Sequence, residues 1–422
     1  MSMSGSTADL LAIEIGAQEK PRPLPTWPAF QEEHLQAVET VLRSGKINYW
    51  TGTECRQFEA EYARSLGAKH AIALANGTVA LELALYAIDL QPGDEVIVPS
   101  HTFVATASAV LARGGIPVFA DVEGTTQNVS AETLEPLLTS RTRAIIVVHM
   151  GGRPCEMDEI YELAQAAGVK LIEDCAQAHG ACYRDRPVGT CSDISAFSFC
   201  QDKIITTGGE GGLVVTNDET LFRLAWSYKD HGKNYDKITN GPHNGLFRPL
   251  HDTPGTNWRL TEMQAALGRV SLALLPEWVE TRRAHAETYK SSLLDHPAIE
   301  IASVPSHLHH SYYKFYCTIV PDRLHDGWSR DLVLQALQAE GVPCGSGSCA
   351  EIYTEKMFQT LHLAPRVRLP SAQHFGERSL MFLTHPTLKT SDVIWMTEKI
   401  QQVLNVATSR APQRMAREVR AA

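Results

Sequence analysis

A single lysine stands where amine chemistry would need one. Lys203 lies between an apolar stretch, Phe197–Phe199, and a glycine-rich turn, Gly208–Gly212. Burial disfavours the charged form of a lysine, and the neutral amine is a nucleophile that can form a Schiff base with a carbonyl carbon. The alternative is a surface lysine in front of a flexible turn, which is what most lysines are. This stretch alone leaves both interpretations open.

Two further stretches carry residues that could bind a charged ligand. Asp174 follows the apolar segment Lys170–Ile172, and ligands of parallel sheets collect at the carboxyl ends of strands. Its carboxylate could pair with a cationic ring nitrogen or a metal ion, or serve as a cap or structural ion pair. Asn76–Thr78 stands where an extended run turns into a helix, whose free N–H groups could hold a phosphate. Taken alone, those residues are better explained as an ordinary helix cap.

The three stretches together match the needs of one cofactor. Pyridoxal 5'-phosphate requires an anion cradle, a carboxylate that keeps its pyridine nitrogen protonated, and a lysine that condenses with its aldehyde. Asn76–Thr78, Asp174 and Lys203 supply these groups in that order along the chain. Phe103 could stack on the cofactor ring, and the alternative interpretation is a core aromatic.

The chemistry-bearing residues lie among short apolar runs that alternate with amphipathic segments along the chain. The pattern predicts an α/β fold with a large, mostly parallel seven-stranded sheet between layers of helices. The predicted strands are Ala71–Ala75, Glu95–Pro99, Pro117–Val122, Ala144–Met150, Lys170–Asp174, Ile194–Phe199 and Gly212–Thr216, with Lys203–Thr206 as a weaker candidate. Helices are expected over Glu32–Ser44, Glu54–Leu66, Val79–Ile88, Val104–Arg113, Ala131–Leu138, Met157–Ala167 and Asp218–Lys229.

The composition changes after a long helical region, Leu260–Tyr289, in which Pro276 predicts a break. Beyond it a strand, Tyr313–Val320, and helices predict a smaller α+β domain. We therefore expect a flexible leader over 1–20, a large cofactor domain over 21–275, a small domain over 276–405 and a flexible tail over 406–422. The Gly-, Asn- and His-rich stretch Asp230–Asn257 is expected to be a functional loop or disordered.

Composition excludes several classes of protein. The chain has 422 residues, 44% of them hydrophobic, which excludes a disordered or fibrous chain. With 38 basic and 48 acidic residues the net charge is −10, which argues against nucleic acid as a partner. No secretion signal or bilayer-spanning run is found, so we expect a cytoplasmic protein with no membrane partner and nine reduced cysteines.

Five ordered motifs carry a resemblance that covers the chain from about Pro28 to about Leu404. The sequence resembles the DegT/DnrJ/StrS-type sugar aminotransferases, a PLP-dependent family of the aspartate-aminotransferase fold class (fold type I). The motifs are Asn76–Leu81, Pro99–Thr106, Glu173–Ala178, Phe197–Lys203 and Gly255–Gly268. One departure stands in the fourth, where Cys200-Gln201-Asp202 replaces the commoner His-Pro-Thr before the lysine.

The resemblance implies a role for each site residue. Lys203 would bind the cofactor aldehyde and then move a proton between substrate and cofactor carbons, and Asp174 would pair with the pyridine nitrogen. Gln177 would contact the ring hydroxyl. An Asn matching Asn257 reaches the phosphate from the partner subunit in this family, which implies a homodimer with shared active sites. The residues expected to hold the phosphate are Asn76, Gly77, Thr78, Ser198 and Asn257.

The resemblance also implies the reaction. An amino group would move from an amino acid, with L-glutamate expected, to a keto group of a nucleotide-activated deoxysugar. A keto-cyclitol acceptor with glutamine as donor, and a non-catalytic regulator on the same fold, remain alternatives. A dehydratase branch of the family carries His in place of the lysine, so Lys203 argues against dehydration.

Four further residues are candidates for contacts with the substrate. Arg259 could grip the donor carboxylate, because a guanidinium binds carboxylates bidentately, or it could pair with Glu262. His309, His310 and Tyr312 are expected near the substrate entrance from the resemblance. No metal site is predicted, because the cysteines form no Cys-x-x-Cys pair and no carboxylate completes a histidine ligand set.

Overall fold

A computed structural model describes residues 22–240 and 249–409, and its centre is a seven-stranded sheet. The strand order is β1-β9-β8-β5-β4-β2-β3, and only β9 runs antiparallel to its neighbours. The strands are β1 His70–Leu74, β2 Glu95–Pro99, β3 Ile116–Ala120, β4 Thr142–Val148, β5 Lys170–Asp174, β8 Ile194–Ser198 and β9 Gly212–Thr216. The predicted mixed, mostly parallel sheet of seven strands is confirmed.

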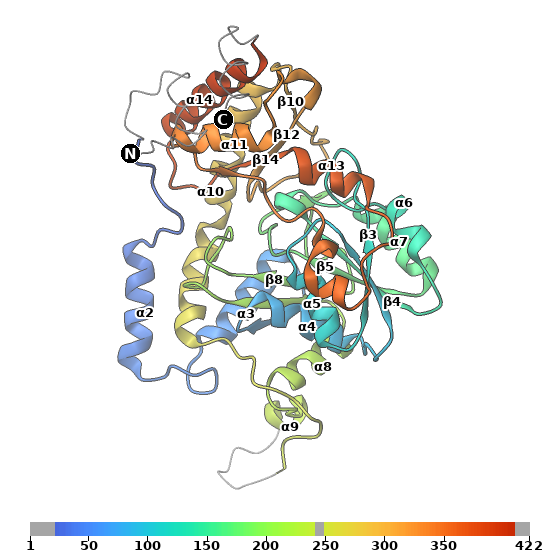
Figure 1. Cartoon of the computed structure of the whole chain (residues 1–422). Helices are drawn as coiled ribbons and strands as arrows, with labels where there is room; N and C mark the ends of the chain where they lie inside the picture. Colours follow the sequence, from blue (N-terminus) through green and yellow to red (C-terminus); the bar gives the residue numbers. More distant parts are fainter. Residues whose placement is uncertain (1–21, 241–248, 410–422) are drawn as a thin grey trace, which may run out of the picture.

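Helices cover both faces of this sheet (Figure 1). Alternate residues of β2 show why, since Val96 and Val98 enter one core with α4 and α5 while Ile97 enters another with α7. Strands buried on both faces read as continuous apolar runs. The helices of this part of the chain are α2 Glu32–Ser44, α3 Glu54–Leu66, α4 Gly77–Ala87, α5 Ala105–Ala112, α6 Ala131–Leu134, α7 Met157–Ala167 and α8 Glu219–Lys229.

A second core lies around a four-stranded antiparallel sheet, at the top of Figure 1. Its strands follow the order β10-β12-β14-β13, and Leu293 and Leu337 represent the helical side chains that fill the core. The elements are β10 Ile299–Glu300, β12 Phe315–Ile319, β13 Cys344–Gly345, β14 Ser379–Phe382, α11 Arg330–Ala339 and α14 Thr390–Thr408. Three short strands form a separate small sheet, β6 Cys182–Tyr183, β7 Arg186–Pro187 and β11 Leu308–His309.

One long helix, α10 Glu262–Leu293, runs from the large core into the small one. The predicted break at Pro276 is wrong, because the helix continues through the proline for 32 residues. A proline removes only one ladder hydrogen bond, and packing on both sides outweighs that loss. Ala265 is buried in the large core before Pro276, and Ala286 in the small core after it.

The chain also crosses between the two cores outside this helix. Leu24 packs against the small core, and Arg22 pairs with Asp392 of α14 at 2.6 Å. In the other direction, Tyr353 and Phe358 return to the large core. The segments concerned are the short helices α12 Lys356–Thr360 and α13 Pro370–Arg378 with the turns before them. The sequence ranges of the two units are therefore interleaved.

Two local predictions need correction. Lys203–Thr206 forms turns and bends instead of a strand, because this segment serves as the tight connection after β8. The stretch 230–257 contains a short helix, α9 Tyr235–Thr239, and residues 241–248 lie outside the described part. The leader over 1–20 and the tail from 410 on also lie outside it. No helix in the described part is long and apolar enough to cross a bilayer.

Candidate active site

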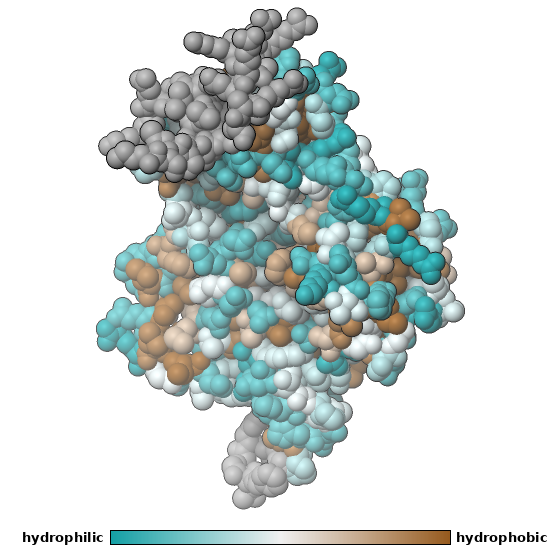
Figure 2. Space-filling view, in the orientation of Figure 1, coloured by the Kyte–Doolittle hydropathy of each residue, from teal (hydrophilic) through white to brown (hydrophobic). Residues whose placement is uncertain are grey.

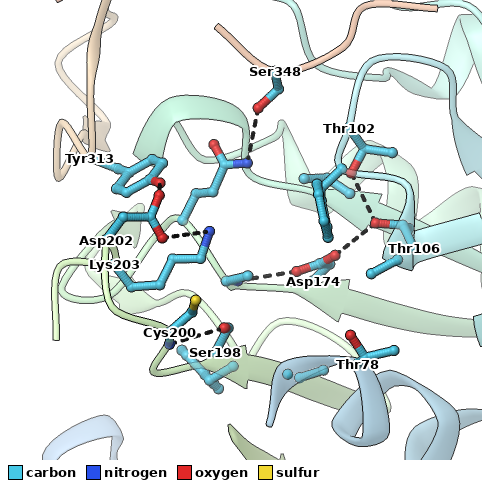
Figure 3. Close-up of a pocket in the computed structure, with 18 of the residues that line it drawn as sticks. Thr78, Thr102, Thr106, Asp174, Ser198, Cys200, Asp202, Lys203, Tyr313 and Ser348 are labelled. Atoms are coloured by element: carbon cyan, nitrogen blue, oxygen red, sulfur yellow. Dashed lines mark hydrogen bonds and ion pairs between the residues drawn. The ribbon is translucent and has the colours of Figure 1, made fainter. Parts of the chain in front are cut away.

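A cavity of about 790 Å³ opens at the carboxyl ends of the parallel strands. Ser198 is the last residue of β8, and Asp174 is the last residue of β5. Eight of the predicted cofactor residues line this one cavity: Asn76, Gly77, Thr78, Phe103, Asp174, Gln177, Ser198 and Lys203. Figure 3 shows several of these side chains pointing toward a common space. The shared edge of the sheet brings together residues that are far apart in the sequence.

The loop after β8 holds Lys203 firmly by its backbone. Its N–H donates to the carbonyl of Cys200 at 3.1 Å, and its carbonyl accepts from Trp27 Nε1 at 2.8 Å. The side chain enters the cavity, where Nζ lies 3.9 Å from Asp202 Oδ1 and 4.9 Å from the ring centroid of Tyr313. The amine is therefore positioned at the cavity with only a distant counter-charge, as a nucleophilic lysine requires.

Asp174 is a buried carboxylate that lacks a cation. Its Oδ2 accepts from Thr106 Oγ1 at 2.9 Å, and its Oδ1 accepts from the N–H of Ala176 at 3.1 Å. Burial raises the pKa of Asp174, and these two hydrogen bonds with the charge of Lys203 only partly oppose the rise. Within the described ranges it forms no ion pair, so a cationic ring nitrogen would complete its environment.

Helix α4 points its N-terminus at the same cavity. Asn76 caps the helix, because its side chain accepts from the N–H of Val79 at 3.0 Å. The N–H groups of Gly77 and Thr78 find no acceptor within residues 22–240 and 249–409. The cap and phosphate interpretations of this turn are thus compatible, since the cap leaves two donors free for an anion.

Two glycines allow this close approach of helix and strand. A Cβ on Gly77 would lie 2.6 Å from the Cβ of Ser198. A Cβ on Gly212 would lie 2.2 Å from the carbonyl oxygen of Asn76. Contacts this short do not occur in folded proteins, so any larger residue would push α4 away from the end of β8. The Ser198 hydroxyl is thereby held beside the free N–H groups.

Pyridoxal 5'-phosphate fits these groups. The free donors of α4 and Ser198 suit its phosphate, Asp174 suits its pyridinium, and Lys203 suits its aldehyde. Gln177 is held at the cavity, where its Oε1 accepts from the N–H of Gly151 at 2.9 Å. Phe103 is 65% exposed, which overturns the core-aromatic interpretation and leaves its ring free to stack on a ligand.

Several cavity residues had no role in the sequence interpretation. Thr106 bonds Asp174, and Asp202 accepts a hydrogen bond from the hydroxyl of Tyr313. Lys203 and Tyr313 hold the pKa of Asp202 below its usual range, although burial opposes this. Lys314 and Ser348 also line the cavity. Thr106 stood inside a family motif, but nothing in the sequence showed which small-domain residues reach the site.

Five predicted residues lie outside this cavity in the single chain. Arg259 pairs with Asp230 at 2.6 Å, and the alternative partner Glu262 instead accepts from the N–H of Cys55 at 3.2 Å. His309, His310 and Tyr312 do not line the cavity, and the ring of His310 stacks on Tyr312 with centroids 3.8 Å apart. Asn257 also lies outside it. The predicted His/Tyr contact is corrected to the next residue, Tyr313, which lines the cavity. The backbone turns at this point, with a φ of +46° at Tyr312 and a bend over residues 313–314.

One buried group of potential metal ligands lies elsewhere, formed by His149, Glu173 and Cys175. Glu173 accepts from His149 Nε2 at 3.0 Å and from the N–H groups of Gly189 and Cys191 at 2.8 and 2.9 Å. The other ring nitrogen of His149 accepts from the N–H of Cys155 at 3.1 Å. The protein itself satisfies these atoms, so the group serves as a structural network.

Comparisons with known proteins agree with this site. The model of the DegT/DnrJ/EryC1/StrS aminotransferase family matches residues 28–401. A UDP-N-acetyl-3-dehydro-alpha-D-glucosamine 3-aminotransferase of Acidithiobacillus ferrooxidans is 36% identical over 377 residues, which are 89% of this chain and 95% of the relative. A GDP-perosamine synthase of Escherichia coli O157:H7 is 30% identical over 384 residues, 90% of this chain and 96% of that one.

Solved structures show the same relationship. An aminotransferase from Psychrobacter cryohalolentis superposes with a TM-score of 0.90 at 46% identity, covering 92% of this chain and 100% of the other. The predicted fold, the PLP-dependent aminotransferase class and the cofactor are confirmed. The chain belongs to the DegT/DnrJ/EryC1/StrS aminotransferase family.

Proposed function

We propose that this protein transfers the amino group of L-glutamate to a keto group of a nucleotide-activated deoxysugar. The observation that carries the proposal is the shared cavity, which is lined by the Lys203 amine, the cation-free Asp174 carboxylate and the free helix N-terminus at Thr78. Whole-length relatives that aminate nucleotide sugars by name support the substrate class.

Each part of the cavity has a task in this reaction. The first turn of α4 and Ser198 would hold the cofactor phosphate, Phe103 and Gln177 would orient the ring, and Asp174 would keep the ring nitrogen protonated. Bound pyridoxal phosphate supplies an electron sink that stabilises negative charge at the substrate carbon.

Lys203 would then move the proton. Its Nζ would take the proton from the α-carbon of the donor, and would return a proton to the cofactor carbon. The backbone bonds of Lys203 to Cys200 and Trp27 limit its movement to the side chain, which is what repeated proton transfer between fixed carbons needs. Asp202, which accepts a hydrogen bond from the Tyr313 hydroxyl, keeps a carboxylate oxygen 3.9 Å from the amine.

A homodimer forms part of the proposal. The resemblance assigns Asn257 to the partner's active site, and the single chain indeed leaves Asn257 outside its own cavity. Apolar side chains also stand exposed on and beside α2, namely Phe30, Leu35, Leu42 and Ile47. Figure 2 shows brown surface gathered at the left, where α2 lies in Figure 1. An exposed apolar patch of this kind is typical of a protein interface.

The reaction can be tested with purified holoprotein and L-glutamate. We expect amination of at least one 3-keto or 4-keto nucleotide sugar, detected as the amino sugar by mass spectrometry, and no product with Lys203→Ala. A parallel panel contains keto-inositols with glutamine as donor. Turnover with the keto-inositols alone would show that the acceptor is a cyclitol and not a nucleotide sugar. Cofactor uptake without turnover of any compound would favour the non-catalytic alternative.

Shared active sites have a separate test. Asn257→Ala and Lys203→Ala homodimers should both be impaired. If Asn257 serves the partner's site, a mixed dimer contains one site with both native residues, so unfolding and refolding the two variants together should restore activity. Activity that stays at the level of the separate variants would contradict the shared site.

A further inference from the structure

A second amine enters the active-site cavity from the small domain. Lys314 immediately precedes β12 and lines the cavity together with Lys203. The two Nζ atoms each lie 4.9 Å from the ring centroid of Tyr313, so they are separated by less than twice that distance. A group bound to Lys314 would therefore lie within one small molecule's length of the reacting carbon at Lys203.

Lys314 differs from the other partly or fully buried lysines in having no counter-ion. Lys229, Lys233 and Lys399 lie 3.6, 3.0 and 3.0 Å from carboxylate oxygens of Glu59, Asp230 and Glu340. Within the described part of the chain, the Lys314 amine has neither an ion pair nor a hydrogen bond. The amine lies 4.9 Å from the ring centroid of Tyr313.

The charges around Lys314 add to this imbalance. Burial lowers the pKa of Lys314 to about 8, the charges of Arg282 and Lys203 lower it too, and only Asp202 opposes them. Asp202 is already engaged by Tyr313 and lies beside Lys203. Arg282 is completely buried and donates only to the Tyr313 carbonyl and the Thr384 hydroxyl, so it brings no carboxylate of its own. This end of the cavity holds more positive than negative charge.

An unpaired amine in a cavity destabilises the protein unless a ligand supplies the missing charge. The proposed substrates supply it, since an amino-acid donor carries carboxylates and a nucleotide sugar carries a diphosphate. Both classes must bring their reacting carbon to Lys203, and both then place an anionic group within reach of Lys314.

We infer that Lys314 binds an anionic oxygen group of the substrate, and so selects substrates that carry a carboxylate or phosphate near the reacting carbon. The inference rests on the proposed function and adds a specificity residue to it. The two sources share one chemistry, a charge-assisted hydrogen bond to the amine, which is stronger than a neutral one.

The test uses holoprotein with Lys314→Gln, with Lys314→Arg to restore the charge, and with Lys290→Gln as the matched control. Lys290 is a small-domain lysine on α10 that lines a neighbouring cavity instead of this one. The half-reactions are followed separately by cofactor absorbance, with L-glutamate alone and then with the amino-sugar nucleotide alone. Binding of glutarate and of UDP is measured by calorimetry, which does not depend on turnover.

For Lys314→Gln we expect a rise of roughly tenfold to a hundredfold in the half-saturating concentration of one substrate, with the limiting rate changed far less. A shift with L-glutamate and glutarate assigns the donor carboxylate, and a shift with the amino-sugar nucleotide and UDP assigns the phosphate. Lys314→Arg should recover most of the loss, and Lys290→Gln should behave as wild type.

Constants that stay within twofold of wild type for all four compounds would overturn the inference. The proposed function fails on a different result, the absence of turnover by the wild-type protein on any nucleotide sugar. Cofactor absorbance and melting temperature of each variant show whether it is loaded and folded before its constants are compared.

Discussion

Two neighbouring carboxylates on β5 have opposite environments. Glu173 faces α7 and is satisfied by His149 and by the N–H groups of Gly189 and Cys191. Asp174 faces the cavity, with two donors and no cation. These contacts hold the pKa of Glu173 below its usual range although burial opposes them, whereas burial raises the pKa of Asp174.

The difference assigns a structural role to Glu173 and a ligand-binding role to Asp174, although both residues lie on β5. A carboxylate whose oxygens are all bonded by the protein is part of the fold, and adding a ligand there would break existing bonds. A buried carboxylate left short of a positive charge is unfavourable until a ligand brings one. Because side chains alternate along a strand, adjacent residues can serve these two roles without touching each other.

The largest effect should come from the cavity side, at Lys203. Lys203→Ala removes the amine that the site assignment gives to the cofactor aldehyde, so we expect loss of the yellow absorbance and of all measurable transamination. Spectra and product analysis of the purified variant provide the measurement. Full turnover in this variant would invalidate the whole site assignment.

Asp174→Asn should slow proton transfer by a factor on the order of 10²–10³, because a neutral amide cannot stabilise the protonated form of the cofactor's ring nitrogen. The shape of the residue is kept, so the melting temperature should stay near that of wild type. Stopped-flow absorbance after mixing with L-glutamate measures the rate. Unchanged kinetics would show that Asp174 does not interact with the cofactor nitrogen, and the proposed functional difference from Glu173 would then be wrong.

Glu173→Gln should show the opposite pattern. Breaking this buried network should lower the free energy of unfolding by about 3 kcal/mol, while the rate per folded, loaded molecule changes little. The lowered pKa of Glu173 contributes stability above the pKa of the unfolded chain, and that stability is lost as the pH falls toward the folded value. The variant should therefore lose part of the acid sensitivity of wild-type unfolding, measured in urea at several pH values. A catalytic defect at normal stability would contradict this assignment.

Lys314→Met should have the smallest effect, and it should be stabilising. The pKa of Lys314 is lowered from 10.5 to about 8 by burial and by Arg282, so its charge costs about 1 to 3 kcal/mol below pH 8. This destabilisation decreases as the pH rises from 8 to 10.5. In that range the folded protein has already released the Lys314 proton, while the unfolded chain still binds it. The charged groups that act on Lys314 are Arg282, Lys203 and Asp202, and the titratable His385 is also close enough to interact with its charge. Urea unfolding of the substrate-free holoprotein at pH 7 and above pH 10 tests this, and lower stability at pH 7 would contradict it.

Helix ends near the N-terminus were predictable to the residue. Glu32–Ser44 and Glu54–Leu66 end before Gly45 and Gly67, which adopt the left-handed conformation that glycine favours. Pro276 carried an equally strong local signal and was misleading, because burial of α10 in two cores outweighs one missing hydrogen bond. Local rules therefore predicted elements well where local interactions decide their ends.

The active site divides in the same way. Asp174 is the last residue of β5, and the Asn76–Thr78 turn and Lys203 come within a few residues of the ends of β1 and β8. Their positions in the sequence therefore already predicted a shared edge of the sheet. Tyr313, Lys314 and Ser348 reach that edge from the other unit of the chain, and no pattern near them shows it. Arg259 had the right chemistry for a carboxylate, but its contact with Asp230 depends on the packing of a distant segment.

By itself, the sequence determined the sheet, the family, the cofactor chemistry and the residues that end the strands. These follow from hydrophobic periodicity and from residue types at strand ends, which act over a few neighbouring positions. Only the tertiary structure decided which carboxylate on β5 lacks a partner, which lysine of the small domain enters the cavity without a counter-ion, and which arginine is already paired. Burial and pairing are sums over residues that are distant in the chain, so no local stretch of sequence contains them.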